Sequence, residues 1–166
     1  MRALPFARLI VLVAVASVAT GCSAANSGGG SPTPQLQLRV VTSSVKGPCS
    51  APPLTSEGPG SACDRAGTTT YGLAKSLGVV TPTSVTRDGQ GTGQTVVAEL
   101  DEADASKFGD VTGKTVDMQL AILLGGKVLS APVVKEPLTG GKVAFTFGTA
   151  SEAEKVATEL GASATP

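Results

Sequence analysis

The chain has 166 residues, and its 13 lysine and arginine side chains are balanced by 13 aspartates and glutamates, so its formal net charge is zero. No stretch of basic residues is dense enough to bind a phosphate backbone, which argues against a nucleic-acid partner. Histidine is absent, and this excludes histidine-dependent nucleophilic sites and most zinc sites. We therefore expect no enzymatic activity, no bound metal and no cofactor.

The first 21 residues have the parts of a signal peptide for export. Arg2 and Arg8 give a basic start, and residues 9–19 (LIVLVAVASVA) form an apolar stretch that is shorter than the roughly 20 residues needed to span a bilayer. The small residues that follow end directly before Cys22, in a pattern that resembles the lipobox of bacterial lipoproteins. We predict cleavage before Cys22, lipid attachment to its thiol and anchoring at the extracytoplasmic face of the cell membrane; an ordinary secretory signal is the alternative.

Residues 22–34 then form a Gly-, Ser- and Pro-rich linker, and residues 35–81 an N-terminal region. Alternating polar and apolar side chains predict a strand over residues 35–41, followed by a long irregular excursion to residue 70. Cys49 and Cys63 lie in this excursion, and outside the cytoplasm such a pair favours a disulfide over free thiols; its loop of about 15 residues is worth ~3 kcal/mol. Residues 71–80 fit either a helical turn or an extended segment.

The signals are clearer over residues 82–163. Strands are predicted at residues 84–87 and 94–100 around a glycine-rich loop, which lacks the spacing of a phosphate-binding loop. A helix follows Asp101, with Asp104 placed to bond back to its first turn, and runs to about residue 112. Strands are then predicted at residues 119–124, 127–134 and 142–147, and the last helix is capped by Thr149 or Ser151. The helix faces expected in the core contain Ala105, Phe108, Val111 or Thr112, and then Ala153, Val156, Ala157 and Leu160.

This order predicts an α+β fold, with two helices on one face of an antiparallel sheet in a ferredoxin-like arrangement, preceded by the irregular N-terminal region.

Val143, Phe145 and Phe147 lie on one face of the strand at residues 142–147. We predict this strand as a candidate peptide-binding element, because an extended peptide can add to a free sheet edge. Burial of the three side chains in the core is the competing interpretation. The acidic run at residues 99–104 is explained by the start of a helix without a metal.

Residues 118–141 (MQLAILLGGKVLSAPVVKEPLTGG) resemble a stretch of SecD, a subunit of the Sec protein-export machinery, that has the pattern LAIVLDGKVLSAP followed by a Gly-Gly pair. The strand and helix before it and the helix after it are similar to the same family; Gly125 stands where the family usually has Asp. The resemblance implies a freestanding version of the first extracytoplasmic (P1) region of SecD, with its head subdomain. It also implies exported unfolded polypeptides or the Sec translocon as partners, and no proton-driven motor. A repurposed envelope lipoprotein with an unrelated ligand is the alternative function.

Overall fold

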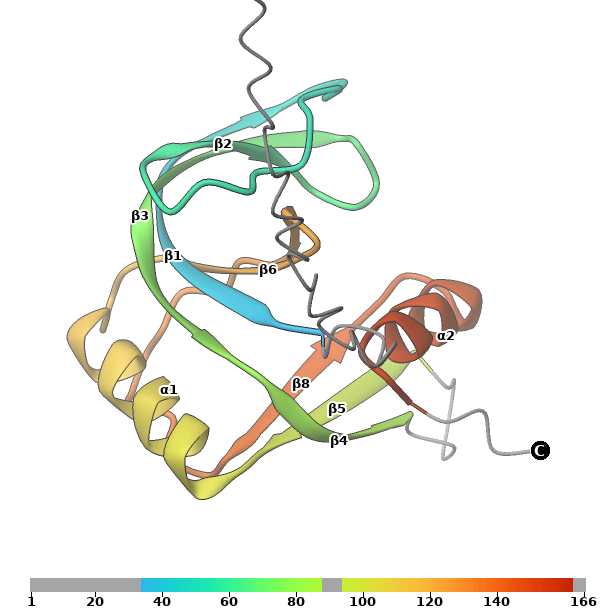
Figure 1. Ribbon diagram of the computed structural model, residues 1–166. Helices are drawn as coiled ribbons and strands as arrows, with labels where there is room; N and C mark the ends of the chain where they lie inside the picture. Colours follow the sequence, from blue (N-terminus) through green and yellow to red (C-terminus); the bar gives the residue numbers. More distant parts are fainter. Residues whose placement is uncertain (1–33, 88–93, 163–166) are drawn as a thin grey trace, which may run out of the picture. The chain divides into compact units, whose positions relative to one another are not determined.

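The computed structural model describes residues 34–87 and 94–162, and the structural statements below concern these residues. Five strands precede the first helix, and three more strands separate it from the second (Figure 1). In chain order the elements are β1 (Leu36–Lys46), β2 (Gly60–Cys63), β3 (Thr69–Val80), β4 (Pro82–Arg87), β5 (Thr95–Leu100), α1 (Glu102–Lys114), β6 (Leu120–Leu124), β7 (Lys127–Ser130), β8 (Lys142–Thr146) and α2 (Ala150–Glu159).

The strands form two antiparallel sheets, one with the order β2-β3-β1-β6-β7 and one with the order β4-β5-β8. The predicted α+β class is confirmed, but the single predicted sheet is wrong, because β6 and β7 join the N-terminal strands. Leu36 and Leu38 of β1 pair with Leu124 and Ile122 of β6. The predicted segments 35–81 and 82–163 therefore share the five-stranded sheet.

The five-stranded sheet is strongly curved (Figure 1). Three register shifts interrupt the pairing of β1 with β3 between Leu38 and Ser43, and irregularities of this kind bend a strand and increase its twist. The outermost strands, β2 and β7, consequently approach each other, and Asp64 forms an isolated parallel bridge with Val128. The excursion predicted over residues 42–70 is therefore only partly irregular, since it contains the end of β1, all of β2 and the start of β3. Residues 71–80 are extended.

The main hydrophobic core lies where one face of each sheet meets both helices. α1 packs against β3 and β5, and α2 packs against β4 and β5. Phe108 is the largest fully buried apolar side chain of α1, with Val111 and Thr112 beside it, whereas Ala105 is partly buried. The predicted inner face of α2 is confirmed. Its buried residues are Ala153, Val156 and Ala157, followed by Leu160 at the C-terminal cap.

The hairpin between β6 and β7 turns at Gly125 and Gly126, whose φ angles are +57° and +76°. Two successive residues with positive φ are what a two-residue type I′ loop requires, and glycine adopts this conformation without strain. β7 ends at Ser130, earlier than predicted. Pro132 has no N–H to donate to a ladder, and pairing resumes only as an isolated bridge between Gln119 and Val133.

Residues 49–59 cover the second face of the five-stranded sheet, and we call them the strap. Leu54 packs on a small apolar cluster formed by β2, β3, β6 and β7. The strap's main chain is also bonded to the sheet, with Leu54 N–H donating to the carbonyl oxygen of Gly126 and Ser76 N–H to that of Glu57, both at 2.9 Å. All five side chains of β6 are buried, so this strand needs apolar cover on both of its faces. The strap provides that cover on the second one.

Candidate functional site

β8 forms one edge of the three-stranded sheet. It pairs with β5 on one side, and among the described residues no strand pairs with its other side. Its side chains alternate as the sequence KVAFT predicts, with Val143 and Phe145 buried and Lys142, Ala144 and Thr146 exposed. β8 is thus a short edge strand with one apolar face packed inward and one face open to solvent.

The hydrogen-bond pattern shows which main-chain groups of this edge are free. Leu100 N–H donates to the carbonyl oxygen of Gly141 at 2.8 Å, and Phe147 N–H donates to that of Gln94 at 2.9 Å. Both pairs follow the register of β5 with β8, in which every second residue pair exchanges hydrogen bonds. Residues 143 and 145 therefore bond to β5. The main-chain groups that point away from β5 belong to Lys142, Ala144 and Thr146.

The side chains predicted to contact a peptide lie in the main core. Val143, Phe145 and Phe147 are 7%, 3% and 9% exposed and pack among the buried residues of both helices. They are not accessible to a peptide in this fold, because the apolar face of the strand is the one that the helices cover. A peptide-binding role for the strand stays a prediction, and it now concerns the free main-chain edge. Strand periodicity identified the faces of β8 but could not show which edge β5 occupies.

A polar row crosses the outer face of the three-stranded sheet beside this edge. Lys142 Nζ lies 2.7 Å from Glu99 Oε1, and the hydroxyl of Ser84 donates to Glu99 Oε2 at 3.0 Å. The hydrogen bond from Lys142 and then that from Ser84 lower the pKa of Glu99. The Lys142 charge at the start of β8 is therefore matched by a carboxylate on the neighbouring strand.

The other strand edges are less suited to bind an added strand. β4, at the far side of the three-stranded sheet, begins with Pro82, which has no N–H to donate to an added strand. Its last residue, Arg87, forms an ion pair with Glu154 of α2 at 3.5 Å. The outer strands of the five-stranded sheet approach each other through the bridge between Asp64 and Val128. The edge of β8 is accordingly the clearest place for an added strand in the described part of the chain.

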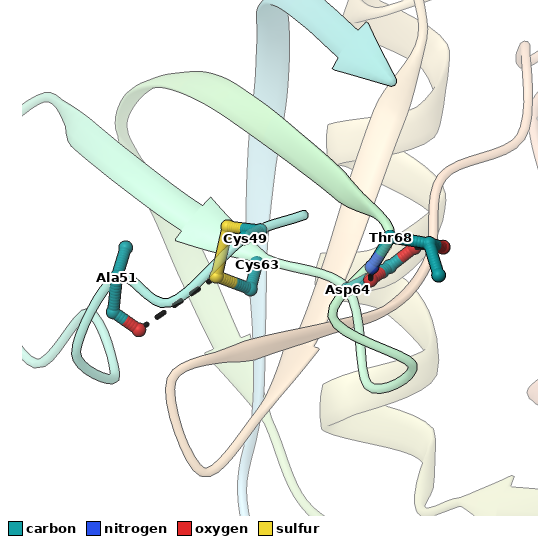
Figure 2. Close-up of a disulfide and its surroundings, with 5 residues drawn as sticks. All are labelled: Cys49, Ala51, Cys63, Asp64 and Thr68. Atoms are coloured by element: carbon teal, nitrogen blue, oxygen red, sulfur yellow. Dashed lines mark hydrogen bonds between the residues drawn. A yellow bond between two sulfur atoms is a disulfide. The ribbon is translucent and has the colours of Figure 1, made fainter. Parts of the chain in front are cut away.

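The predicted pairing of Cys49 with Cys63 is present as a disulfide, and Cys49 is the first residue of the strap (Figure 2). Cys63 is buried, and its sulfur lies 3.7 Å from the carbonyl oxygen of Ala51. The bond joins the start of the strap to the end of β2. It therefore fixes the start of the segment that covers the second face of the sheet.

A tight turn next to the disulfide connects β2 to β3. The carboxylate of Asp64 accepts a hydrogen bond from the N–H of Thr68 at 2.7 Å, and its other oxygen accepts from the Thr68 hydroxyl at 2.8 Å (Figure 2). Burial by itself raises the pKa of Asp64, but the hydrogen bonds from Thr68 and Thr69 together outweigh it and lower the pKa. This carboxylate stabilises the turn and is not free for other chemistry.

Arg39 holds the C-terminal part of the strap and was not singled out from the sequence. Its side chain is fully buried. One terminal nitrogen donates to the carbonyl oxygens of Gly58 at 2.6 Å and Ala74 at 2.9 Å, and the other donates to that of Ser56. The guanidinium therefore bonds main-chain carbonyls of the strap and of β3 together. In the alternating pattern of this strand Arg39 falls on the same face as the polar Gln37, so no local pattern indicated its burial.

The charge of Arg39 is partly compensated. Its Nε donates to the side-chain oxygen of Gln37 at 2.9 Å, and Gln37 in turn donates to the carboxylate of Glu57 at 3.0 Å. Burial lowers the pKa of Arg39, while the nearby Glu57 charge raises it. An arginine retains its proton at neutral pH regardless of such shifts, so the strap is held by a permanent buried cation.

The acidic run at residues 99–104 has structural roles. Asp101 caps α1, and its side chain accepts a hydrogen bond from Asp104 N–H at 2.8 Å. Asp104 does not bond back to the helix start as predicted, because its carboxylate accepts from Thr81 N–H at 2.7 Å and fixes α1 to the β3–β4 junction. The hydrogen bond from Lys107 is the main cause of its lowered pKa. No cluster of three potential metal ligands occurs within residues 34–87 and 94–162.

The predicted lipid-attachment site, Cys22, and its linker up to residue 33 lie outside the described residues. The described helices include none that combines the length and apolarity needed to cross a bilayer.

The sequence matches the family described as the SecDF P1 head subdomain, over residues 74–166. The SecD protein translocase subunit of Acidaminococcus fermentans is 47% identical over 76 residues, which cover 45% of this chain and 18% of that protein. The SecDF subunit of Thermus thermophilus is 35% identical over 63 residues, covering 37% and 9% of the two chains. The chain thus spans less than a fifth of the length of these two relatives.

Two solved structures share the fold. A membrane component SecDF that enhances protein export has a TM-score of 0.54 and 19% sequence identity, with coverage of 77% of this chain and 62% of that chain. SecDF in a super-membrane-facing form has a TM-score of 0.52 and 23% identity, with coverage of 77% and 18%. At these identities the likeness concerns the arrangement of the strands and helices.

Proposed function

Because the chain belongs to the SecDF P1 head subdomain family, we propose that it is an extracytoplasmic binding module that acts in protein export. Its relatives are subunits of the protein translocase, of which it spans only a small part. In this proposal it contacts exported polypeptides or the Sec complex, has no proton-driven motor of its own and catalyses no reaction.

The proposed anchor is a lipid on Cys22. It would keep the head near the membrane through the linker at residues 22–34. Membrane fractionation of a Cys22→Ala variant tests this step, because the unmodified protein should leave the membrane fraction. Persistence of the variant in the membrane fraction would show that the lipid is not the anchor.

The observation that supports a binding role is the free edge of β8. An extended polypeptide can add to such an edge through main-chain hydrogen bonds, which suit a partner that has not yet folded and whose sequence varies. The exposed side chains of Ala144 and Thr146 are small and leave room for many sequences. Lys142 is paired with Glu99, so it presents no unmatched charge to the added segment.

Site-specific photocrosslinking in living cells tests the proposal. A photoreactive residue at Ala144, on the free edge, should capture exported chains or Sec components. The same residue at Thr86 is the control, because β4 lies two strands away in the same sheet. Capture of one unrelated envelope protein alone, or equal capture from both positions, would favour a repurposed lipoprotein over a role in export.

A proline substitution separates main-chain recognition from nonspecific contact. The N–H of Ala144 points away from β5, so Ala144→Pro removes a group that the sheet itself does not use, and edge strands tolerate proline at such positions. Ala144→Thr keeps the N–H and suits a strand. With the photoreactive residue moved to Thr146 in both variants, we expect capture of exported chains to be lost only with proline.

A further inference from the structure

We propose that the edge of β8 also pairs with β8 of a second copy of this chain, in an antiparallel arrangement centred on Ala144. The two three-stranded sheets would then form one continuous six-stranded sheet with two-fold symmetry. This inference goes beyond the proposed function and does not depend on it, because it follows from the geometry of the edge alone.

The main-chain groups of the edge are self-complementary. The free groups lie at residues 142, 144 and 146, at intervals of two, as an antiparallel partner requires. A two-fold axis at Ala144 places this residue opposite itself and places Lys142 opposite Thr146 of the second copy. All three residues then exchange hydrogen bonds with an identical strand. Such an isologous contact is the usual basis of a symmetric dimer.

The side chains fit the same register. Val143 comes to lie opposite Phe145 of the second copy, in pairs without hydrogen bonds, where side chains approach most closely. Both side chains are already buried in the core of their own copy, so the main-chain hydrogen bonds carry most of the contact. On the outer face Lys142 lies opposite a threonine and is matched by Glu99 at 2.7 Å, so no like charges face each other directly. The lysine that would otherwise protect the edge from pairing is neutralised within its own sheet.

Pairing of two copies occupies the groups that an extended polypeptide would use. The self-paired form and a polypeptide-bound form therefore exclude each other. An extended segment in excess should convert the dimer to monomers, whereas a folded protein without a free strand should not.

The test uses the mature chain with Cys22→Ser, which leaves the Cys49–Cys63 disulfide intact and introduces no free thiol. Sedimentation equilibrium over a range of concentrations measures its self-association, and circular dichroism with thermal unfolding checks that each variant is folded. Symmetry makes Ala144→Pro remove two main-chain hydrogen bonds from each dimer, so we expect the dimer dissociation constant to rise on the order of 30-fold. Ala144→Thr, which retains both bonds, should leave the dissociation constant within a few fold of the parent.

Chemical crosslinking gives a second readout. In the proposed dimer the two copies of residue 144 are about 5.5 Å apart between Cα atoms, so a short bismaleimide should join two Ala144→Cys chains. Residues 86 of the two copies would be five strand spacings apart, about 24 Å, and Thr86→Cys should not be joined. A monomer at every concentration, a dimer that Ala144→Pro leaves unchanged, or equal crosslinking at both positions would overturn the inference. Capture of exported chains in cells would be unaffected by that failure, so the two proposals are separable.

Discussion

Replacement of Gly126 by alanine should release the strap from the sheet. An added Cβ at Gly126 would lie 2.7 Å from the nitrogen and 2.9 Å from the oxygen of Leu54, both main-chain atoms that cannot move without displacing the strap. The adjacent Gly125 is a matched control, because its φ is also positive but an added Cβ would have no neighbour within 4 Å. The two substitutions share the backbone strain and differ only in the contact with the strap.

The expected loss of stability in each variant follows from the backbone strain and from the contact with the strap. Left-handed backbone at a non-glycine residue costs roughly 1–2 kcal/mol, which is the whole expected cost of Gly125→Ala. Gly126→Ala adds the loss of the hydrogen bond from Leu54 N–H to Gly126 O, about 1 kcal/mol. It also removes part of the burial of Leu54, worth roughly 1–2 kcal/mol. The free energy of unfolding should thus fall by about 2–3 kcal/mol more for Gly126→Ala than for Gly125→Ala.

Urea unfolding of the two variants and of the parent chain measures this difference, and hydrogen exchange locates it. Amide protons at Leu54 and Ser76, which bond between the strap and the sheet, should lose protection in Gly126→Ala and retain it in Gly125→Ala. Equal losses of stability in the two variants, or unchanged protection of Leu54 in Gly126→Ala, would refute the conclusion that the strap is fixed through this turn.

Three further outcomes are expected. Replacement of Cys49 and Cys63 by serine should lower the free energy of unfolding by ~3 kcal/mol, measured by urea unfolding; an unchanged midpoint would contradict a stabilising role for the disulfide. Arg39→Met should cost about 3 kcal/mol or more by the same assay, because buried carbonyls lose their donors, and Arg39→Lys should not restore them all. An NMR titration should place the pKa of Glu99 below its ordinary value, so this group adds stability above its unfolded-state pKa that is lost as the pH falls through its folded-state pKa. Lys142→Gln should raise that pKa, and an unaltered titration would show that the ion pair is not formed in solution.

The local elements were largely predictable because their signals are local. The cap of α1 at Asp101, the glycine turn at residues 125–126 and the alternation of the strand over residues 142–147 each depend on side chains within a few positions. The inner face of α2 followed from its helical spacing for the same reason. The local pattern of residues 71–80 fits a helical turn as well as a strand, and pairing with β1 decides that the segment is extended.

The sequence by itself determined the α+β class, the pairing of Cys49 with Cys63 and the kinship with SecD, since these depend on residue types and their spacing. Only the tertiary structure decided that the strands divide between two sheets, that Arg39 binds the strap and that Val143, Phe145 and Phe147 face the core. The physical reason is that β pairing joins residues distant in the chain: residues of β1 pair with residues of β6 that lie 80 to 88 positions later. No local pattern specifies such a partner, or which edge of β8 is left free.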